Sequence, residues 1–324
     1  MGIRIIFRIV FCTVLALHVP QNAESQESKT TIPRIGYLGM TPRPPDEDFR
    51  RGLRELGYEE GKNIFIEFHW IEASGHTPAQ EADNLVRSKP DIIVAVASPA
   101  TQAVKDATST IPIIFVGIGD PVAYGFVPSL AHPGGNLTGL SSGLLEIGTK
   151  ALQILKELAP SAELIAIISN PDNPGDLPTR KAIENAAPVV GVKVANYPVS
   201  KPDDLTRVFD TLAKAPPDGL YVIPDHLLFT QRERLVEFAA KNKLPAVYGL
   251  REYVLSGGLV AIGPNRTDMY RRAASYVDKI LKGASPADLP VEQPTRFELI
   301  LNTKAAAELG LSVPISVMVD EVIE

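Results

Sequence analysis

The feature that most constrains this chain is a repeated alternation of short apolar runs and amphipathic segments. Asp91–Ala97 (DIIVAVA) is a continuous apolar run of strand length, typical of a strand buried on both faces of a parallel sheet. Asp48–Leu56 repeats its apolar residues at a helical spacing and is followed by Gly57, a common helix terminator. This rhythm predicts parallel sheets covered by helices on both faces, with right-handed crossovers.

The alternation occurs twice, so residues 34–135 and 140–249 predict two similar α/β units in tandem. In the first unit we expect strands at Arg34–Leu38, Ile64–Trp70, Asp91–Ala97 and Ile111–Val116, and helices at Asp48–Leu56, Thr77–Arg87 and Pro99–Ala107. In the second we expect strands at Leu164–Ser169, Lys193–Tyr197, Gly219–Ile223 and Pro245–Tyr248, and helices at Gly148–Leu158, Arg180–Val190, Asp203–Ala213 and Thr230–Asn242. Two strands and two helices should follow them, at Leu259–Ile262, Asp268–Leu281, Phe297–Ile300 and Thr303–Leu309.

The N-terminus has the pattern of a secretory signal peptide. Arg4 and Arg8 precede the apolar stretch Ile9–Val19, which has signal-core length and is too short to span a bilayer. A polar stretch follows, so we expect residues 1–26 to be removed and the rest to be exported. An uncleaved membrane anchor and a lipid-modified Cys12 are the alternatives.

Composition and motifs exclude several functional classes. The net charge is −6, so the chain lacks the basic excess of a duplex-binding protein, and we expect no nucleic-acid partner. Cys12 is the single cysteine and the five histidines are scattered, so no metal site is indicated, and no glycine-rich nucleotide motif points to a cofactor. Gly139–Gly143 matches G-x-S-x-G, but the next helix is expected only from about Gly148 and His226 is the single downstream histidine, so we expect no enzyme.

Polar residues follow the expected strands of the first unit, at the sheet edge where ligands of open α/β sheets bind. Ser98 and Thr101 put hydroxyl and backbone N–H groups at a helix start, which suits a carboxylate, although Ser98 as a plain N-cap explains the same residues. Gly119 and Asp120 offer close backbone approach and a carboxylate, or only a turn.

The second unit has the same kind of residues at its strand ends. Asn170 begins a loop (NPDN) that fits either a binding site or simple turn chemistry. Asp225 and His226 follow a buried strand, and the acid there either receives an ammonium group or caps the next helix.

The run Asp120–Gly139 (DPVAYGFVPSLAHPGGNLTG) resembles the signature of an ABC-transporter substrate-binding protein family with the type I periplasmic-binding-protein fold. Phe49–Tyr58 and Glu60–Asn63 are similar to the first helix and turn of that family, and Asp320–Glu324 is similar to its ending. The resemblance covers residues 33–324.

This resemblance implies an α/β protein with two doubly wound parallel-sheet lobes joined by three hinge crossovers. The crossovers would lie near Asn136–Ser142, Leu250–Gly257 and Ser285–Pro294. Lobe 1 would comprise residues 33–138 plus 255–288, which includes the strand Leu259–Ile262, and lobe 2 would comprise residues 139–254 plus 289–324.

The implied function is that of a periplasmic, monomeric solute-binding subunit of an ABC importer, closing on a small molecule and working with a permease and its ATPase. Some relatives bind amino acids, including aromatic ones, so Asp120 and Asp225 would face an ammonium group, and Tyr37, Tyr124 or Tyr248 would stack on a side chain. The alternative is a ligand-sensing protein of the same fold that serves a receptor or histidine kinase.

Overall fold

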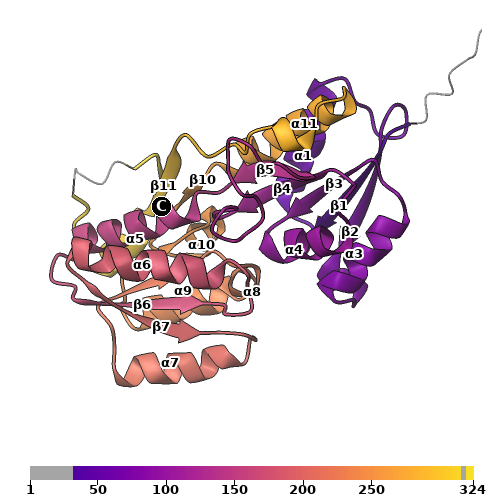
Figure 1. Ribbon diagram of the computed structural model, residues 1–324. Coiled ribbons are helices and arrows are strands. Elements are labelled where there is room, and N and C mark those ends of the chain that lie inside the picture. Colours follow the sequence, from indigo (N-terminus) through magenta and orange to yellow (C-terminus); the bar gives the residue numbers. More distant parts are fainter. Residues whose placement is uncertain (1–31, 315–318) are drawn as a thin grey trace, which may run out of the picture. The chain divides into compact units, whose positions relative to one another are not determined.

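The computed structural model describes residues 32–314 and 319–324, which form two β-sheets flanked by helices (Figure 1). The expected signal peptide lies outside the described residues.

The first sheet has five parallel strands in the order β2-β1-β3-β4-β5. Their bounds are β1 Arg34–Gly39, β2 Phe65–Trp70, β3 Ile92–Val96, β4 Ile113–Ile118 and β5 Leu137–Ser141. The helices between them are α1 Pro44–Glu55, α2 Ile71–Ser74, α3 Pro78–Arg87 and α4 Ser98–Ala107. The four expected strands of the first unit are confirmed, and β5 is an additional strand within the segment expected to be the first crossover.

The second sheet has seven strands in the order β12-β11-β10-β9-β8-β6-β7. Their bounds are β6 Leu164–Ser169, β7 Lys193–Pro198, β8 Gly219–Val222, β9 Ala246–Tyr248, β10 Val260–Pro264, β11 Phe297–Asn302 and β12 Glu321–Ile323. The remaining helices are α5 Leu144–Leu158, α6 Asp176–Val190, α7 Asp204–Lys214, α8 His226–Thr230, α9 Arg232–Lys241, α10 Arg251–Leu255, α11 Arg266–Leu281, the 3-10 turn η1 Pro286–Asp288 and α12 Thr303–Glu308. This sheet is mixed, because β10 and β11 run antiparallel.

The strand expected at Leu259–Ile262 does not return to the first lobe, so that part of the predicted lobe assignment is wrong. β10 pairs with β9 and β11 inside the second sheet. The segment expected to be the second crossover holds α10, which connects β9 to β10 within that sheet and leaves no length for a crossing. The chain crosses instead at Asn265, between β10 and α11, and α11 packs against α1 of the first unit. The other lobe bounds stay predictions.

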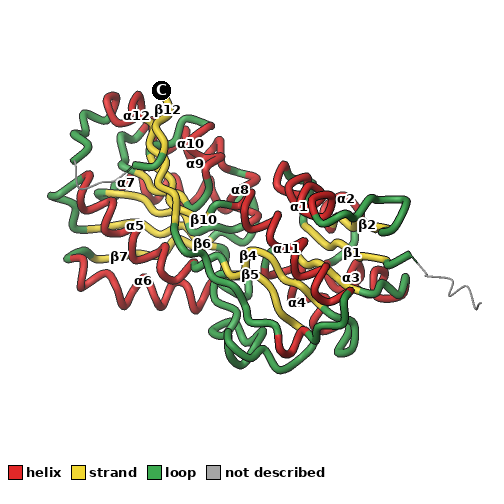
Figure 2. The backbone as a smooth tube through the Cα atoms, turned by 90° about the horizontal axis from the view of Figure 1, so that it is seen from above, coloured by secondary structure: helices red, strands yellow, loops and turns green. Residues whose placement is uncertain are grey.

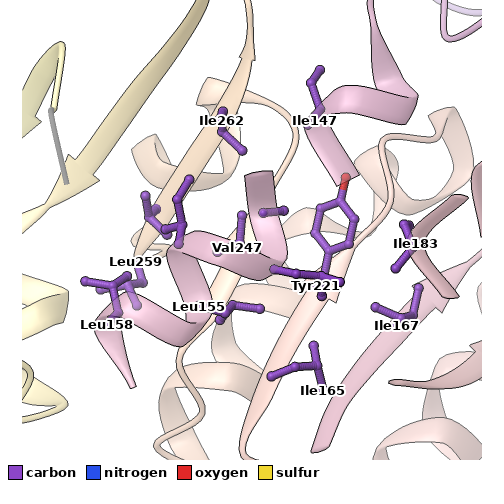
Figure 3. Packing of buried hydrophobic residues seen from close by; sticks show 14 of the residues in the cluster. Ile147, Leu155, Leu158, Ile165, Ile167, Ile183, Tyr221, Val247, Leu259 and Ile262 are labelled. Carbon is purple, nitrogen blue, oxygen red and sulfur yellow. The ribbon is translucent and has the colours of Figure 1, made fainter. Parts of the chain in front are cut away.

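The central strands of each sheet are buried on both faces, which explains their continuous apolar runs. In the first sheet, α1 and α11 cover one face and α3 and α4 cover the other (Figure 2). In β6, Ile165 and Ile167 pack into the cluster around α5 and α6, shown in Figure 3, whereas Ala166 and Ile168 pack into the cluster on the opposite face. Since neighbouring strand residues point to opposite faces, the four positions from Ile165 to Ile168 are all apolar, and burying each large side chain contributes about 1.5–3 kcal/mol.

Candidate functional site

A cavity lies where strands of both sheets end, which is the place that the strand–helix pattern predicts. The first sheet lines it with Val96–Pro99 and with residues at the end of β4. The second sheet lines it with Asn170, Ile223–His226 and Gly249. A small molecule in this cavity therefore touches residues of both sheets.

The structure brings five of the eight expected ligand-binding residues to this cavity. They are Ser98, Gly119, Asn170, Asp225 and His226. Thr101, Asp120 and Tyr248 do not line it.

Thr101 and Asp120 have local partners instead. Thr101 is fully buried, and its hydroxyl donates to the Ala97 carbonyl at 2.9 Å. One carboxylate oxygen of Asp120 accepts the backbone N–H groups of Val122 and Ala123, both at 2.9 Å. These contacts match the turn alternative for Asp120.

Of the three tyrosines expected to stack on a ligand, only Tyr124 lines the cavity. Tyr248 is fully buried in the core of the second sheet and stacks on Tyr253, with 4.6 Å between ring centroids. Tyr37 is also fully buried, and its hydroxyl donates to Asp46 at 2.5 Å. The sequence pattern placed these residues near strand ends but did not resolve which way each ring points.

Ser98 begins α4 without capping it. The N-cap is Ala97, which has no side-chain cap bond and adopts a φ of 70°. The alternative in which Ser98 is a plain N-cap is therefore wrong. A positive φ at a residue other than glycine costs about 1–3 kcal/mol and is found at ligand clamps among other places. The uncapped start of α4 faces the cavity through Ala97 and Ser98.

Asp225 caps a helix, as one of its two alternatives predicts, and its carboxylate also binds two asparagine side chains. One carboxylate oxygen accepts the Leu228 N–H at 3.1 Å and caps α8. The side-chain amide of Asn170 also donates to this carboxylate, at 3.2 Å for the shorter of its two contacts, and the amide of Asn173 donates at 2.8 Å. Because Asp225 is only 8% exposed and lines the cavity, its carboxylate is held in one orientation beside the space for a ligand.

Asp176 is a second cavity acid, which the sequence reasoning missed. One of its oxygens accepts from the Arg180 guanidinium at 2.7 Å, while the other is buried and has no hydrogen-bond partner in the part of the chain described. Asp176 and Arg180 are four residues apart, which is the spacing of an ion pair on one face of a helix. This signal was missed because the helix was expected to begin only at Arg180.

His226 connects the two units through Arg43 and Glu72, which the sequence reasoning also missed. One ring nitrogen (Nδ1) contacts the Arg43 guanidinium, and the other (Nε2) contacts the Glu72 carboxylate. Burial, followed by the charge of Arg43, lowers the pKa of His226, although Glu72 opposes the shift. The neutral ring therefore accepts from Arg43 at Nδ1 and donates to Glu72 from Nε2.

Tyr124 makes another contact between the units. Its hydroxyl lies 2.8 Å from the Thr179 hydroxyl on α6, which itself donates to the Gly175 carbonyl at 2.7 Å. Burial raises the pKa of Tyr124 to about 12, so its hydroxyl stays protonated and donates to Thr179.

Residues 46–322 match the family described as ABC transporter substrate binding protein. This chain belongs to that family. Its type I periplasmic-binding-protein architecture, with two α/β lobes, agrees with the expectation from sequence.

Two kinds of relatives support the assignment. A tyrosine-binding protein from Clostridioides difficile (strain R20291) is 30% identical over 297 residues, covering 90% of this chain and 85% of the relative. A solved ABC domain from Streptococcus pneumonia in complex with L-Trp is 26% identical with a TM-score of 0.83, covering 90% of this chain and all of that one. A conserved domain protein from Vibrio cholerae is 27% identical with the same TM-score and the same coverage.

Members of this substrate-binding family are solute-binding proteins rather than enzymes. The G-x-S-x-G segment does lie between a strand and a helix, because α5 begins at Leu144, and the expected onset at Gly148 is wrong. Ser141 is nevertheless buried, and its hydroxyl donates to the Gly119 carbonyl at 2.9 Å. The His226 ring is engaged by Arg43 and Glu72 rather than by this serine.

Within residues 32–314 and 319–324, no three His, Cys, Asp or Glu side chains are grouped so that they could hold a metal ion. None of the helices in these ranges combines the length and the apolar character that crossing a membrane requires.

Proposed function

We propose that this protein is the extracytoplasmic solute-binding subunit of an ABC importer and captures an amino acid or a similar zwitterion between its lobes. The observation that carries the proposal is the cavity lined by the strand ends of both sheets, with the held carboxylate of Asp225 at its wall. The names of the relatives, one tyrosine-binding and one solved with L-Trp, agree with this ligand class.

The two charged ends of a zwitterion have matching groups in the cavity. A ligand ammonium group suits Asp225, and the free oxygen of Asp176 offers a second acceptor. A ligand carboxylate suits the uncapped start of α4 at Ser98, where backbone N–H groups favour negative charge. Tyr124 and the apolar lining residues Ile147 and Ile223 provide walls for the rest of the molecule.

A thermal-shift screen of the processed protein against the common L-amino acids tests this proposal. A ligand at 100 times its Kd adds about 2.7 kcal/mol to the free energy of unfolding, which is a readily measured shift. Stabilisation by purines or sugars but by none of the amino acids would overturn the ligand class.

Capture should close the two lobes on the ligand through the crossovers, because ligand contacts with both lobes favour the closed arrangement. Small-angle scattering should then show a smaller radius of gyration with the ligand than without it. An unchanged radius at saturating ligand would contradict closure.

The importer role includes export to the periplasm, monomeric action and a permease with its ATPase as partners. Export predicts a mature N-terminus between Ala23 and Glu27, and mass spectrometry that finds Met1 intact would contradict it. Deleting the gene should abolish uptake of the ligand. Normal uptake with loss of a ligand-dependent signalling response would instead favour the sensing alternative.

A further inference from the structure

Two arginines line the cavity in addition to the groups assigned to a zwitterion. Arg43 precedes α1 as its N-cap, and Arg266 is the first residue of α11. Since α1 and α11 pack against each other, the two arginines belong to one assembly in the first unit. Tyr270, which also lines the cavity, lies 3.5 Å from a nitrogen of Arg266 through its hydroxyl.

The positive charge of this pair is incompletely balanced. Arg266 is 14% exposed and forms an ion pair with Glu252 at 3.2 Å. Arg43 has no carboxylate within ion-pairing distance of its guanidinium in the described part of the chain. Its side-chain partners are the neutral His226 ring and the face of Phe229, 4.7 Å from the ring centroid.

A half-buried guanidinium without a carboxylate partner is a costly arrangement that an anionic ligand group would relieve. Burial, followed by the charge of Arg266, lowers the pKa of Arg43. The pKa of Arg266 is raised despite its burial, because Tyr270 and Glu252 favour its charged form, so the unbalanced charge lies on Arg43. The contact between Arg43 and His226 also places the guanidinium beside the residue that follows Asp225, so both groups are within reach of one small molecule.

We propose that Arg43 and Arg266 form a second anion-binding end of the cavity, so that the ligand carries an acidic group on its side chain besides its α-carboxylate. This inference rests on the proposed function and names its substrate class as an acidic amino acid. Guanidinium groups bind carboxylates by charge-assisted hydrogen bonds, which are about twice as strong as neutral ones.

Calorimetric titration with matched probes tests this inference. The first pair is L-glutamate and L-glutamine, and the second is 4-carboxy-L-phenylalanine and 4-carbamoyl-L-phenylalanine. Within each pair the two probes share a frame and differ in the side-chain charge. In at least one pair the wild-type protein should bind the acidic probe about 10- to 100-fold more tightly than the neutral one.

The variant Arg43→Gln should reduce that ratio of affinities to within about threefold. Taking the ratio within one variant cancels general effects on closure or folding. Arg232→Gln is the matched control, because Arg232 stacks on the same Phe229 ring, with 5.0 Å to the centroid, but does not line the cavity. This control should keep the wild-type ratio.

Several outcomes would overturn the inference. One is a neutral probe that binds as tightly as its acidic counterpart in both pairs, and another is binding of L-tyrosine or L-tryptophan with no binding of either acidic probe. A third is an equal loss of acidic and neutral probes in Arg43→Gln, which would place the α-carboxylate at Arg43. Failure of all amino acids to bind would instead refute the proposed function, and this inference with it.

Discussion

Replacing Asp225 with asparagine separates its capping role from its proposed role in holding the ligand, because asparagine still caps a helix but no longer carries a charge. The side-chain oxygen that remains can accept the Leu228 N–H, so the cap on α8 should survive with a loss of at most about 1 kcal/mol. The second carboxylate oxygen would be replaced by an NH₂ group. This group would face the NH₂ groups of Asn170 and Asn173, which now donate to the carboxylate and whose orientations are fixed.

The fixed orientations set the cost in stability. The Asn170 oxygen accepts the Asp172 N–H at 3.0 Å, and the Asn173 oxygen accepts the Gly175 N–H at 2.9 Å. Neither amide can turn its oxygen toward the new amide without losing that bond. Loss of hydrogen bonds to a charged acceptor should lower the free energy of unfolding by about 2–3 kcal/mol, or the melting temperature by about 4–10 °C.

If Asp225 holds the ammonium group, the loss of binding free energy in Asp225→Asn should exceed the loss of stability. Removing one partner of a buried, hydrogen-bonded charge pair costs about 2–5 kcal/mol, or about 30- to 5,000-fold in affinity. Calorimetric titration with the amino acid found in the screen measures this loss, and thermal unfolding measures stability in the same preparation.

Asp218→Asn is the matched control for the lost carboxylate. One Asp218 oxygen accepts the backbone N–H groups of Glu163 and Leu164, both at 2.9 Å, and the residue does not line the cavity. This variant should lose stability and keep its affinity. An Asp225→Asn protein that is destabilised but binds within threefold of the wild type would refute the role of Asp225 in holding the ligand.

Three further predictions follow from single contacts. Gly139→Ala should lower the free energy of unfolding, measured by urea denaturation, by about 2–4 kcal/mol. The new Cβ would lie 2.0 Å from a carbonyl oxygen of the neighbouring strand, and the backbone there has a φ of 151°. Gly135 has open space around it, so Gly135→Ala should change the free energy of unfolding by less than about 1 kcal/mol. Tyr124→Phe should weaken ligand affinity about fivefold by removing its hydrogen bond to Thr179, and unchanged affinity would show that this contact does not stabilise the ligand-bound form. The lowered pKa of His226 means that the unfolded chain takes up the proton first as the pH falls below about 6.5, so stability is full above that pH and declines below it. Comparing urea unfolding of the wild type and His226→Gln at pH 7.5 and 5.5 should show a smaller decline in the variant, and an equal decline would contradict the buried neutral ring.

The strands were predictable because their burial on both faces leaves a continuous apolar signal. β3 and β6 lie within one or two residues of their expected bounds. The polar residues that were expected to follow strand ends also lie there. β5 gave no such signal, because its sequence (LTGLS) contains a threonine, a glycine and a serine. All five of its residues are buried, and the Thr138 hydroxyl donates to the Leu289 carbonyl.

The helix starts at the site were the least predictable part. α5 and α6 each begin four residues before their expected starts, at Leu144 and Asp176, and this extra turn brings both residues to the cavity wall. Arg43 and Glu72 were missed for a different reason. Their contacts with His226 span 183 and 154 residues of sequence, and no local pattern encodes a contact of that range.

The most direct test of the account is a crystal structure of the processed protein with the amino acid that stabilises it most. The account predicts that the ligand fills the cavity between the two sheets, with its ammonium nitrogen about 3 Å from the Asp225 carboxylate and with contacts to Ser98 on the opposite side. A ligand bound outside this cavity, or bound within it with no contact to Asp225, would contradict the central claim.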